Sequence, residues 1–237
     1  FADLLDAHSD EIAGVILEPL VQAAGGMVFH DAESLKAIRE ICTSRDILFI
    51  ADEIATGFGR TGTMFACDAP GIAPDIICIG KALSGGAIGL AATCANARVF
   101  DGFLGDDESR ALMHGPTFMA NPLACAAANA SLDLFEDGAR LTHALSLELF
   151  FRQALEPCRT FSGIAEVRTL GAIGVVQMEV PHAISWLRQR FVEEGVWVRP
   201  FGDVVYLMPP LIVDQQEAAA LTGAVVTIME EWSQEEQ

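Results

Sequence analysis

The stretch ILFIADEIATGFGRTGTMFACDAPGIAPDIICIGKALSGG, residues 47–86, decides the fold of this chain. It holds two apolar runs, 47–51 and 76–79, without the alternation of apolar and polar residues that half-exposed strands show. Such runs are typical of strands that helices cover on both faces of a parallel sheet. Ligands of these sheets collect beyond the carboxyl ends of the strands, where Asp52, Glu53 and Lys81 fall. We therefore expect an α/β fold with a ligand site at this edge.

The rest of the chain extends this pattern on both sides. An apolar run at 14–17 and helical spacing over 32–44 precede the strand at 47–51, which gives the order strand, helix, strand and right-handed crossovers. From residue 164 the pattern changes to that of a smaller α+β unit. We expect a larger domain over 1–137 and a small one over 138–237. Helices are expected at 122–135, with Gly138 as the stop, and at 141–155, 183–194 and 215–232.

Composition excludes several classes of partner. The chain has 237 residues, 51% of them apolar, and 14 basic against 33 acidic residues give a net charge of -19. This charge argues against nucleic acid and anionic membranes as partners. No apolar run reaches the roughly 18 to 20 residues of a membrane span, so a cytoplasmic protein is expected. Six scattered cysteines without a CxxC pair indicate reduced thiols and no metal site.

Two residues in the opening stretch could carry chemistry. Lys81, one of only two lysines, follows an apolar strand and precedes a glycine pair. It is either a surface lysine or a reactive amine that, partly desolvated, attacks a carbonyl to form a Schiff base. Asp52 is either an acidic cap on the next turn or a carboxylate that keeps a pyridine nitrogen protonated. Together the two side chains match the needs of pyridoxal phosphate.

Two further motifs hold polar residues of interest. In HGPTFMANP, residues 114–122, Asn121 and Pro122 are expected to start a helix, and the Thr117 hydroxyl suits a phosphate. In VWVRPFGD, residues 196–203, Arg199 lies among apolar residues. It forms either a structural ion pair or a bidentate clamp on a substrate carboxylate. We assign no role to Glu18.

The stretch 47–86 closely resembles the cofactor region of class III aminotransferases, which are fold type I enzymes that use pyridoxal phosphate. Within that family, LMHGPTFMANPLACAAANASL (112–132) and GVWVRPFGDVVYLMPP (195–210) are similar to the branch that acts in biotin synthesis. The resemblance implies a mainly parallel sheet covered by helices, as an incomplete large domain, and a small C-terminal α+β domain. It also implies a homodimer with a shared active site.

The resemblance assigns the cofactor contacts. Lys81 matches the lysine that binds pyridoxal phosphate, and Asp52 matches the partner of the pyridine nitrogen. Ile54 is expected to pack on the ring face. Pro116 and Thr117 match the pair at the cofactor phosphate, which in this family comes from the other subunit.

The resemblance also assigns substrates and their contacts. The biotin branch implies S-adenosylmethionine as amino donor and 8-amino-7-oxononanoate as acceptor. Gly115 matches a substrate contact, and Arg199 matches the arginine that faces the substrate carboxylate. The alternatives are another class III transaminase, acting on an ω-amino acid, a diamine or acetylornithine, and a noncatalytic truncated remnant.

The beginning of the chain departs from the family pattern. The chain opens on Phe1, and the glycine-serine phosphate loop and the aromatic residues that cover the cofactor in this family have no counterpart in it. We expect a C-terminal portion of a longer enzyme. Such a portion is expected to be inactive or to aggregate alone, because its sheet lacks strands at the edge.

Overall fold

The computed structural model describes residues 1–235, which divide into two compact units. Unit 1 is formed by residues that precede Asp137 in the sequence, and most of unit 2 is formed by Asp137 and the residues after it. Two short segments from the first half of the chain also belong to unit 2. Unit 1 comprises Phe1–Val21, Phe29–Phe58 and Phe65–Glu136, and unit 2 comprises Gln22–Val28, Gly59–Met64 and the chain from Asp137 onward. The domain boundary after residue 137 remains a prediction.

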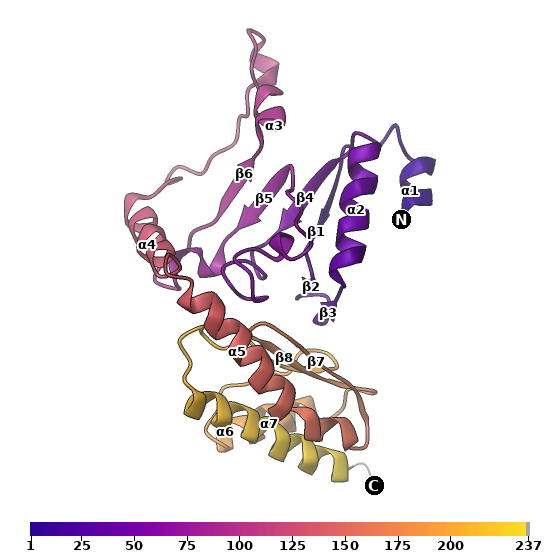
Figure 1. Ribbon diagram of the computed structural model, residues 1–237, viewed down its shortest axis with the longest axis vertical. Helices are drawn as coiled ribbons and strands as arrows, with labels where there is room; N and C mark the ends of the chain where they lie inside the picture. Colours follow the sequence, from indigo (N-terminus) through magenta and orange to yellow (C-terminus); the bar gives the residue numbers. More distant parts are fainter. Residues whose placement is uncertain (236–237) are drawn as a thin grey trace. The chain divides into compact units, whose positions relative to one another are not determined.

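The sheet of unit 1 has four strands in the order β1-β4-β5-β6 (Figure 1). β1 (Gly14–Leu17), β4 (Leu48–Asp52) and β5 (Ile76–Ile79) are parallel, with Leu17 paired to Ala51. β6 (Ala92–Ala95) runs antiparallel to β5. The sequence predicted the three parallel strands but missed β6, because ATCA is short and only weakly apolar.

The two longest helices of unit 1 begin with side-chain caps that the sequence provides. The Asp31 carboxylate accepts a hydrogen bond from the Ser34 N–H at the start of α2 (Ala32–Ser44). The Asn121 side chain accepts from Leu123 and Ala124 at the start of α4 (Pro122–Asp133), so the expected cap is confirmed. The smaller elements are α1 (Ala2–Ala7), the paired strands β2 (Val21–Gln22) and β3 (Val28–Phe29), η1 (Ala66–Asp68), η2 (Lys81–Ser84), α3 (Ala97–Asp101) and η3 (Glu108–Arg110).

A buried carboxylate, that of Asp75, fixes the start of β5. It accepts hydrogen bonds from Arg39 Nη1 at 2.7 Å, the Phe49 N–H at 2.9 Å and Asn96 Nδ2 at 2.9 Å. Burial raises the pKa of Asp75, but these hydrogen bonds outweigh burial and hold the pKa below its ordinary value. The Asp75 carboxylate therefore links α2, β4 and the residue after β6 to the start of β5.

Unit 2 packs three helices on a small antiparallel sheet, β7-β8-β9 (Figure 1). Its core holds Phe151, Phe191 and Trp232, all fully buried. The segment 59–64 is tied to this unit, since Arg60 Nη1 donates to the carbonyl oxygens of Ala172 at 3.2 Å and Pro209 at 2.7 Å. The elements are α5 (Ala139–Ala154), η4 (Glu156–Thr160), β7 (Ile164–Leu170), β8 (Ile173–Met178), α6 (Ile184–Glu193), β9 (Val204–Leu207) and α7 (Gln215–Glu235).

Other expectations are met in part. Helices occur where periodicity predicts them, but Gly138 does not end α4, which stops at Asp133. Gly138 has a φ of 72° and is instead the N-cap of α5. All six cysteines are free thiols, as predicted. Within residues 1–235, no helix combines the length and apolar character that a membrane crossing needs.

Candidate active site

Asp52 and Lys81 lie beyond the carboxyl ends of two neighbouring parallel strands. Asp52 is the last residue of β4 and pairs in register with Cys78 of β5. The next residue, Glu53, donates its backbone N–H to the Cys78 carbonyl oxygen at 2.9 Å. Lys81 follows β5 after Gly80. The sheet therefore brings a carboxylate and an amine to the same edge, as the sequence predicted.

The Asp52 side chain is partly fixed by its own turn. One carboxylate oxygen, Oδ1, accepts the Ile54 N–H at 3.1 Å. This is the local cap that we considered for Asp52, and within residues 1–235 Ile54 is the one donor to that carboxylate. The second oxygen is therefore available to a ligand. Ile54 is close to the lysine strand, because its Cγ2 would lie 3.6 Å from a Cβ built on Gly80.

Lys81 has an unusual backbone and a free side chain. Its φ of 45° lies in the left-handed region, which is costly for a residue with a Cβ and is often found at functional sites. Within the described part of the chain the amine makes no ion pair or hydrogen bond. The side chain is exposed in this chain, as in the surface alternative that we considered for Lys81. The η2 turn that begins at Lys81 buries Leu83 and Ser84 and leaves the lysine outside.

The η2 turn is anchored on α4. Ser131 Oγ donates to the Ala82 carbonyl oxygen at 3.1 Å, and Gly85 closes the turn with a φ of 61°. A Cβ on Gly85 would also face Ser131, at 3.6 Å from its Oγ. The helix that follows the 114–122 motif thus supports the turn that carries Lys81.

The residues assigned to the phosphate and to substrate are exposed. Gly115, Pro116 and Thr117 are all exposed, in the irregular segment between η3 and α4. No hydrogen bond or ion pair among residues 1–235 joins these three residues to Asp52 or Lys81. Arg199 is exposed in unit 2 and forms no ion pair within the described chain, so the structural ion pair that we considered is absent.

Glu53, which lies between Asp52 and Ile54, was assigned no role from the sequence. Glu53 is fully buried, and its carboxylate accepts hydrogen bonds from Thr56, Ala66 and Cys67. Burial raises the pKa of Glu53, although these hydrogen bonds act to lower it. The sequence does show an acidic residue directly after an apolar strand, which could have marked Glu53 as a candidate. Its burial, however, depends on the loop that brings Ala66 and Cys67 back to the end of β4.

Comparison with known proteins identifies the family. The family model described as "Aminotransferase class-III" matches residues 1–229. The chain belongs to the class III aminotransferases. The matched residues include Asp52 and Lys81.

Individual relatives agree with this assignment. The chain is 44% identical to the adenosylmethionine-8-amino-7-oxononanoate aminotransferase of Corynebacterium glutamicum over 91% of its own length and 51% of the relative. The crystal structure of the Methanocaldococcus jannaschii protein of the same name matches with a TM-score of 0.90 and 32% identity, over 97% of this chain and 56% of that one. The chain thus spans about half the length of the relatives it matches.

A third relative has its cofactor bound. An amine transaminase from an uncultivated Pseudomonas species, in its pyridoxal phosphate-bound form, matches with a TM-score of 0.89 and 33% identity, over 98% of this chain and 55% of that one. These matches confirm the expected fold type I architecture. Because the TM-scores of the two structures are nearly equal, the fold does not separate the donors that class III transaminases use.

Proposed function

We propose that the complete protein that contains this chain is a pyridoxal phosphate-dependent transaminase of biotin synthesis. It transfers the amino group of S-adenosylmethionine to 8-amino-7-oxononanoate and forms 7,8-diaminononanoate. The observation that carries this proposal is the 44% identity, over 91% of the chain, to the Corynebacterium glutamicum relative of that name. A cytoplasmic location is part of the same proposal.

The strand-end pair fits pyridoxal phosphate. Lys81 has a free amine at the site edge, and Asp52 has one carboxylate oxygen without a donor from the described residues. Lys81 would hold the cofactor through Nζ and move the substrate Cα proton at the same atom. Asp52 would keep the pyridine nitrogen protonated, and Ile54 would pack on the ring. When bound, the cofactor supplies an electron sink for the bond that breaks at the substrate Cα.

A second copy of the protein would complete the site. Pro116 and Thr117 would bind the cofactor phosphate of the partner subunit, and Gly115 would contact its substrate. The support for this part is the exposure of apolar side chains around these residues. Met113 is 90% exposed and Phe118 is 83% exposed. Such side chains are typical of a surface that another chain covers.

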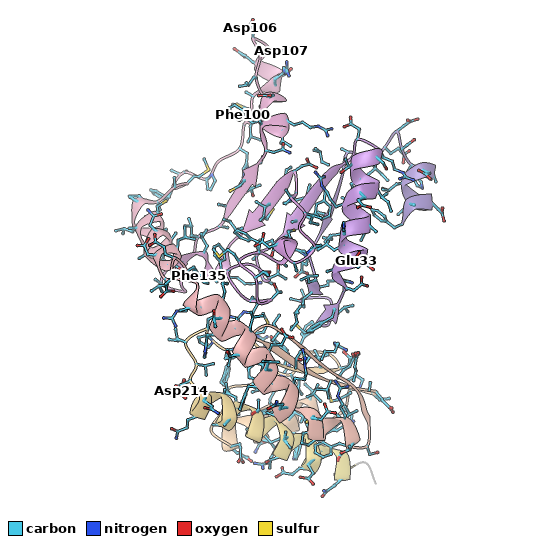
Figure 2. The ribbon with its side chains drawn as sticks, in the orientation of Figure 1. Glu33, Phe100, Asp106, Asp107, Phe135 and Asp214 are labelled. Atoms are coloured by element: carbon cyan, nitrogen blue, oxygen red, sulfur yellow. The ribbon has the colours of Figure 1, made fainter. Side chains whose placement is uncertain are left out.

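The same exposure continues along the arm formed by α3 and η3. Figure 2 shows Phe100 on this arm, with Asp106 and Asp107 near its end. Phe100 is 59% exposed, and Phe103 and Leu104 are exposed too. We place the dimer interface on this arm and on the segment that leads to α4.

Arg199 would bind the substrate carboxylate. Its guanidinium is exposed and has no acidic partner in residues 1–235, which leaves its planar donor pair free for a bidentate contact. Both substrates of the proposed reaction carry a carboxylate, so one arginine can serve both halves of the reaction.

The amino donor tests the proposal. With the complete protein loaded with pyridoxal phosphate, transfer from S-adenosylmethionine to 8-amino-7-oxononanoate is expected. Transfer only from glutamate, alanine or a diamine would replace this assignment by another class III transaminase. Cofactor binding without transfer from any donor would favour the noncatalytic alternative.

A further inference from the structure

Glu53 is a buried carboxylate without a cation. Its side chain is 0% exposed, and within residues 1–235 no lysine or arginine forms an ion pair with it. Its two neighbours, Asp52 and Ile54, are only half-buried. Burying a carboxylate in this way is costly unless donors surround it.

Three donors satisfy this carboxylate. Oε2 accepts from Thr56 Oγ1 at 2.5 Å and from the Ala66 N–H at 3.0 Å. Oε1 accepts from the Cys67 N–H at 2.9 Å. Ala66 and Cys67 are the first residues of η1, which follows the loop after β4. The Glu53 carboxylate therefore closes that loop back onto the strand end.

The backbone of Glu53 is fixed as well. Its N–H donates to the Cys78 carbonyl oxygen of β5, and its carbonyl oxygen accepts the Gly57 N–H at 2.9 Å. A Cβ on Gly57 would approach that carbonyl oxygen to 2.9 Å, so the turn requires a glycine there. Side chain and backbone together hold one residue by five hydrogen bonds, at the position between the two proposed cofactor contacts.

We infer that Glu53 is a positioning residue that fixes Asp52 and Ile54 for contact with the cofactor ring. The inference rests on the proposed function of the strand-end pair. Rotation of the backbone at residue 53 would turn the Asp52 carboxylate and move Ile54 away from Gly80. The five hydrogen bonds of Glu53 prevent that rotation. Asp52 thus acts on the cofactor directly, whereas Glu53 acts through Asp52.

The test uses Glu53→Gln in the complete protein. A carboxamide has one acceptor oxygen, so its NH2 group must face the N–H of either Ala66 or Cys67. We expect the dissociation constant of pyridoxal phosphate to rise by up to about tenfold, because the turn that is loosened by one unpaired buried N–H must be re-ordered when the cofactor binds. We also expect a shift in the pH at which the visible absorption of the bound cofactor changes. In the cofactor-free protein, amide hydrogen exchange at Ile54 and Gly57 should become faster.

Two control variants make the result specific. Asp68→Asn alters an exposed carboxylate of the same loop, one that accepts the Phe65 N–H, and should leave cofactor affinity unchanged. Thr56→Ala removes one donor and should act in the same direction as Glu53→Gln, with a smaller effect. It keeps the test possible if Glu53→Gln does not fold.

Asp52→Asn separates this inference from the proposed function. If Glu53 acts through Asp52, adding Glu53→Gln to Asp52→Asn should change the affinity and the spectral pH little further. Independent effects that multiply would overturn the positioning role. If Asp52→Asn changes both readouts and Glu53→Gln and Thr56→Ala change neither, the inference alone fails. If Asp52→Asn itself changes neither, the proposed function of Asp52 fails.

Discussion

Gly171 joins the turn between β7 and β8 to the segment 59–64, and replacing it with alanine should destabilise unit 2. Gly171 has a φ of 53°, and a Cβ there would lie 2.5 Å from the Arg60 carbonyl oxygen and 2.6 Å from the Gly62 nitrogen. That is about 0.9 Å short of the 3.4 Å at which ordinary contact begins. The contacted atoms are backbone atoms, so the clash cannot be relieved by rotating a side chain.

Two costs combine in Gly171→Ala. A Cβ in the left-handed region costs about 1 to 2 kcal/mol. Overpacking against a fixed backbone adds about 1 to 3 kcal/mol. The free energy of unfolding should therefore fall by about 2 to 5 kcal/mol. The matched control is Gly195→Ala, where φ is 81° and a Cβ would meet nothing within 4 Å, so only the first cost applies.

Urea unfolding of the complete protein and the two variants measures the difference. Amide hydrogen exchange at Ala172, whose N–H donates to the Arg60 carbonyl oxygen at 3.0 Å, reports on the same contact locally. Exchange at Ala172 should become faster in Gly171→Ala and stay unchanged in Gly195→Ala. Equal losses of stability in the two variants, with equal exchange at Ala172, would refute the packing argument.

Three further predictions concern charge, thiols and substrate. The pKa of Asp75 is lowered in the folded state, so its contribution to the free energy of unfolding is present at neutral pH and is lost as the pH falls below about 4. Asp75→Asn should therefore lower the free energy of unfolding at pH 7 and reduce its decrease at acid pH, as measured by unfolding at a series of pH values. A thiol reagent should modify exposed Cys94 before Cys158, whose pKa burial raises to about 12, and the reverse order in peptide mapping would contradict the described burial. Arg199→Ala should raise KM about tenfold or more while the cofactor still binds, and loss of cofactor binding would make Arg199 structural.

Periodicity and motif order predicted much of the fold. The helix over 32–44 and the strands at 14–17 and 76–79 have the expected bounds, because long periodic segments and apolar runs are decided locally. β6 was missed because its pairing to β5 depends on tertiary contact. Gly138 was placed at the wrong helix end because a left-handed glycine can precede a helix as well as follow one.

The sequence predicted the two charged residues of the candidate site, but not the hydrogen bonds that hold the neighbouring residue Glu53. Asp52 and Lys81 follow apolar strands, so sheet topology alone brings them to one edge. The burial of Glu53 could not be read from the sequence, because its donors at 66 and 67 come from a returning loop. The sequence left open whether Lys81 is exposed, since the direction of the η2 turn decides it.

The proposed role of Lys81 is tested by finding which lysine binds the cofactor. The complete protein is loaded with pyridoxal phosphate, reduced with borohydride and mapped by peptide mass spectrometry. We expect the added mass on Lys81, with Lys36, the other lysine of this chain, unmodified. Lys81→Ala should lose the added mass and the visible absorption of the bound cofactor together. A stable adduct on any other lysine, or unchanged absorption in Lys81→Ala, would contradict the proposed site.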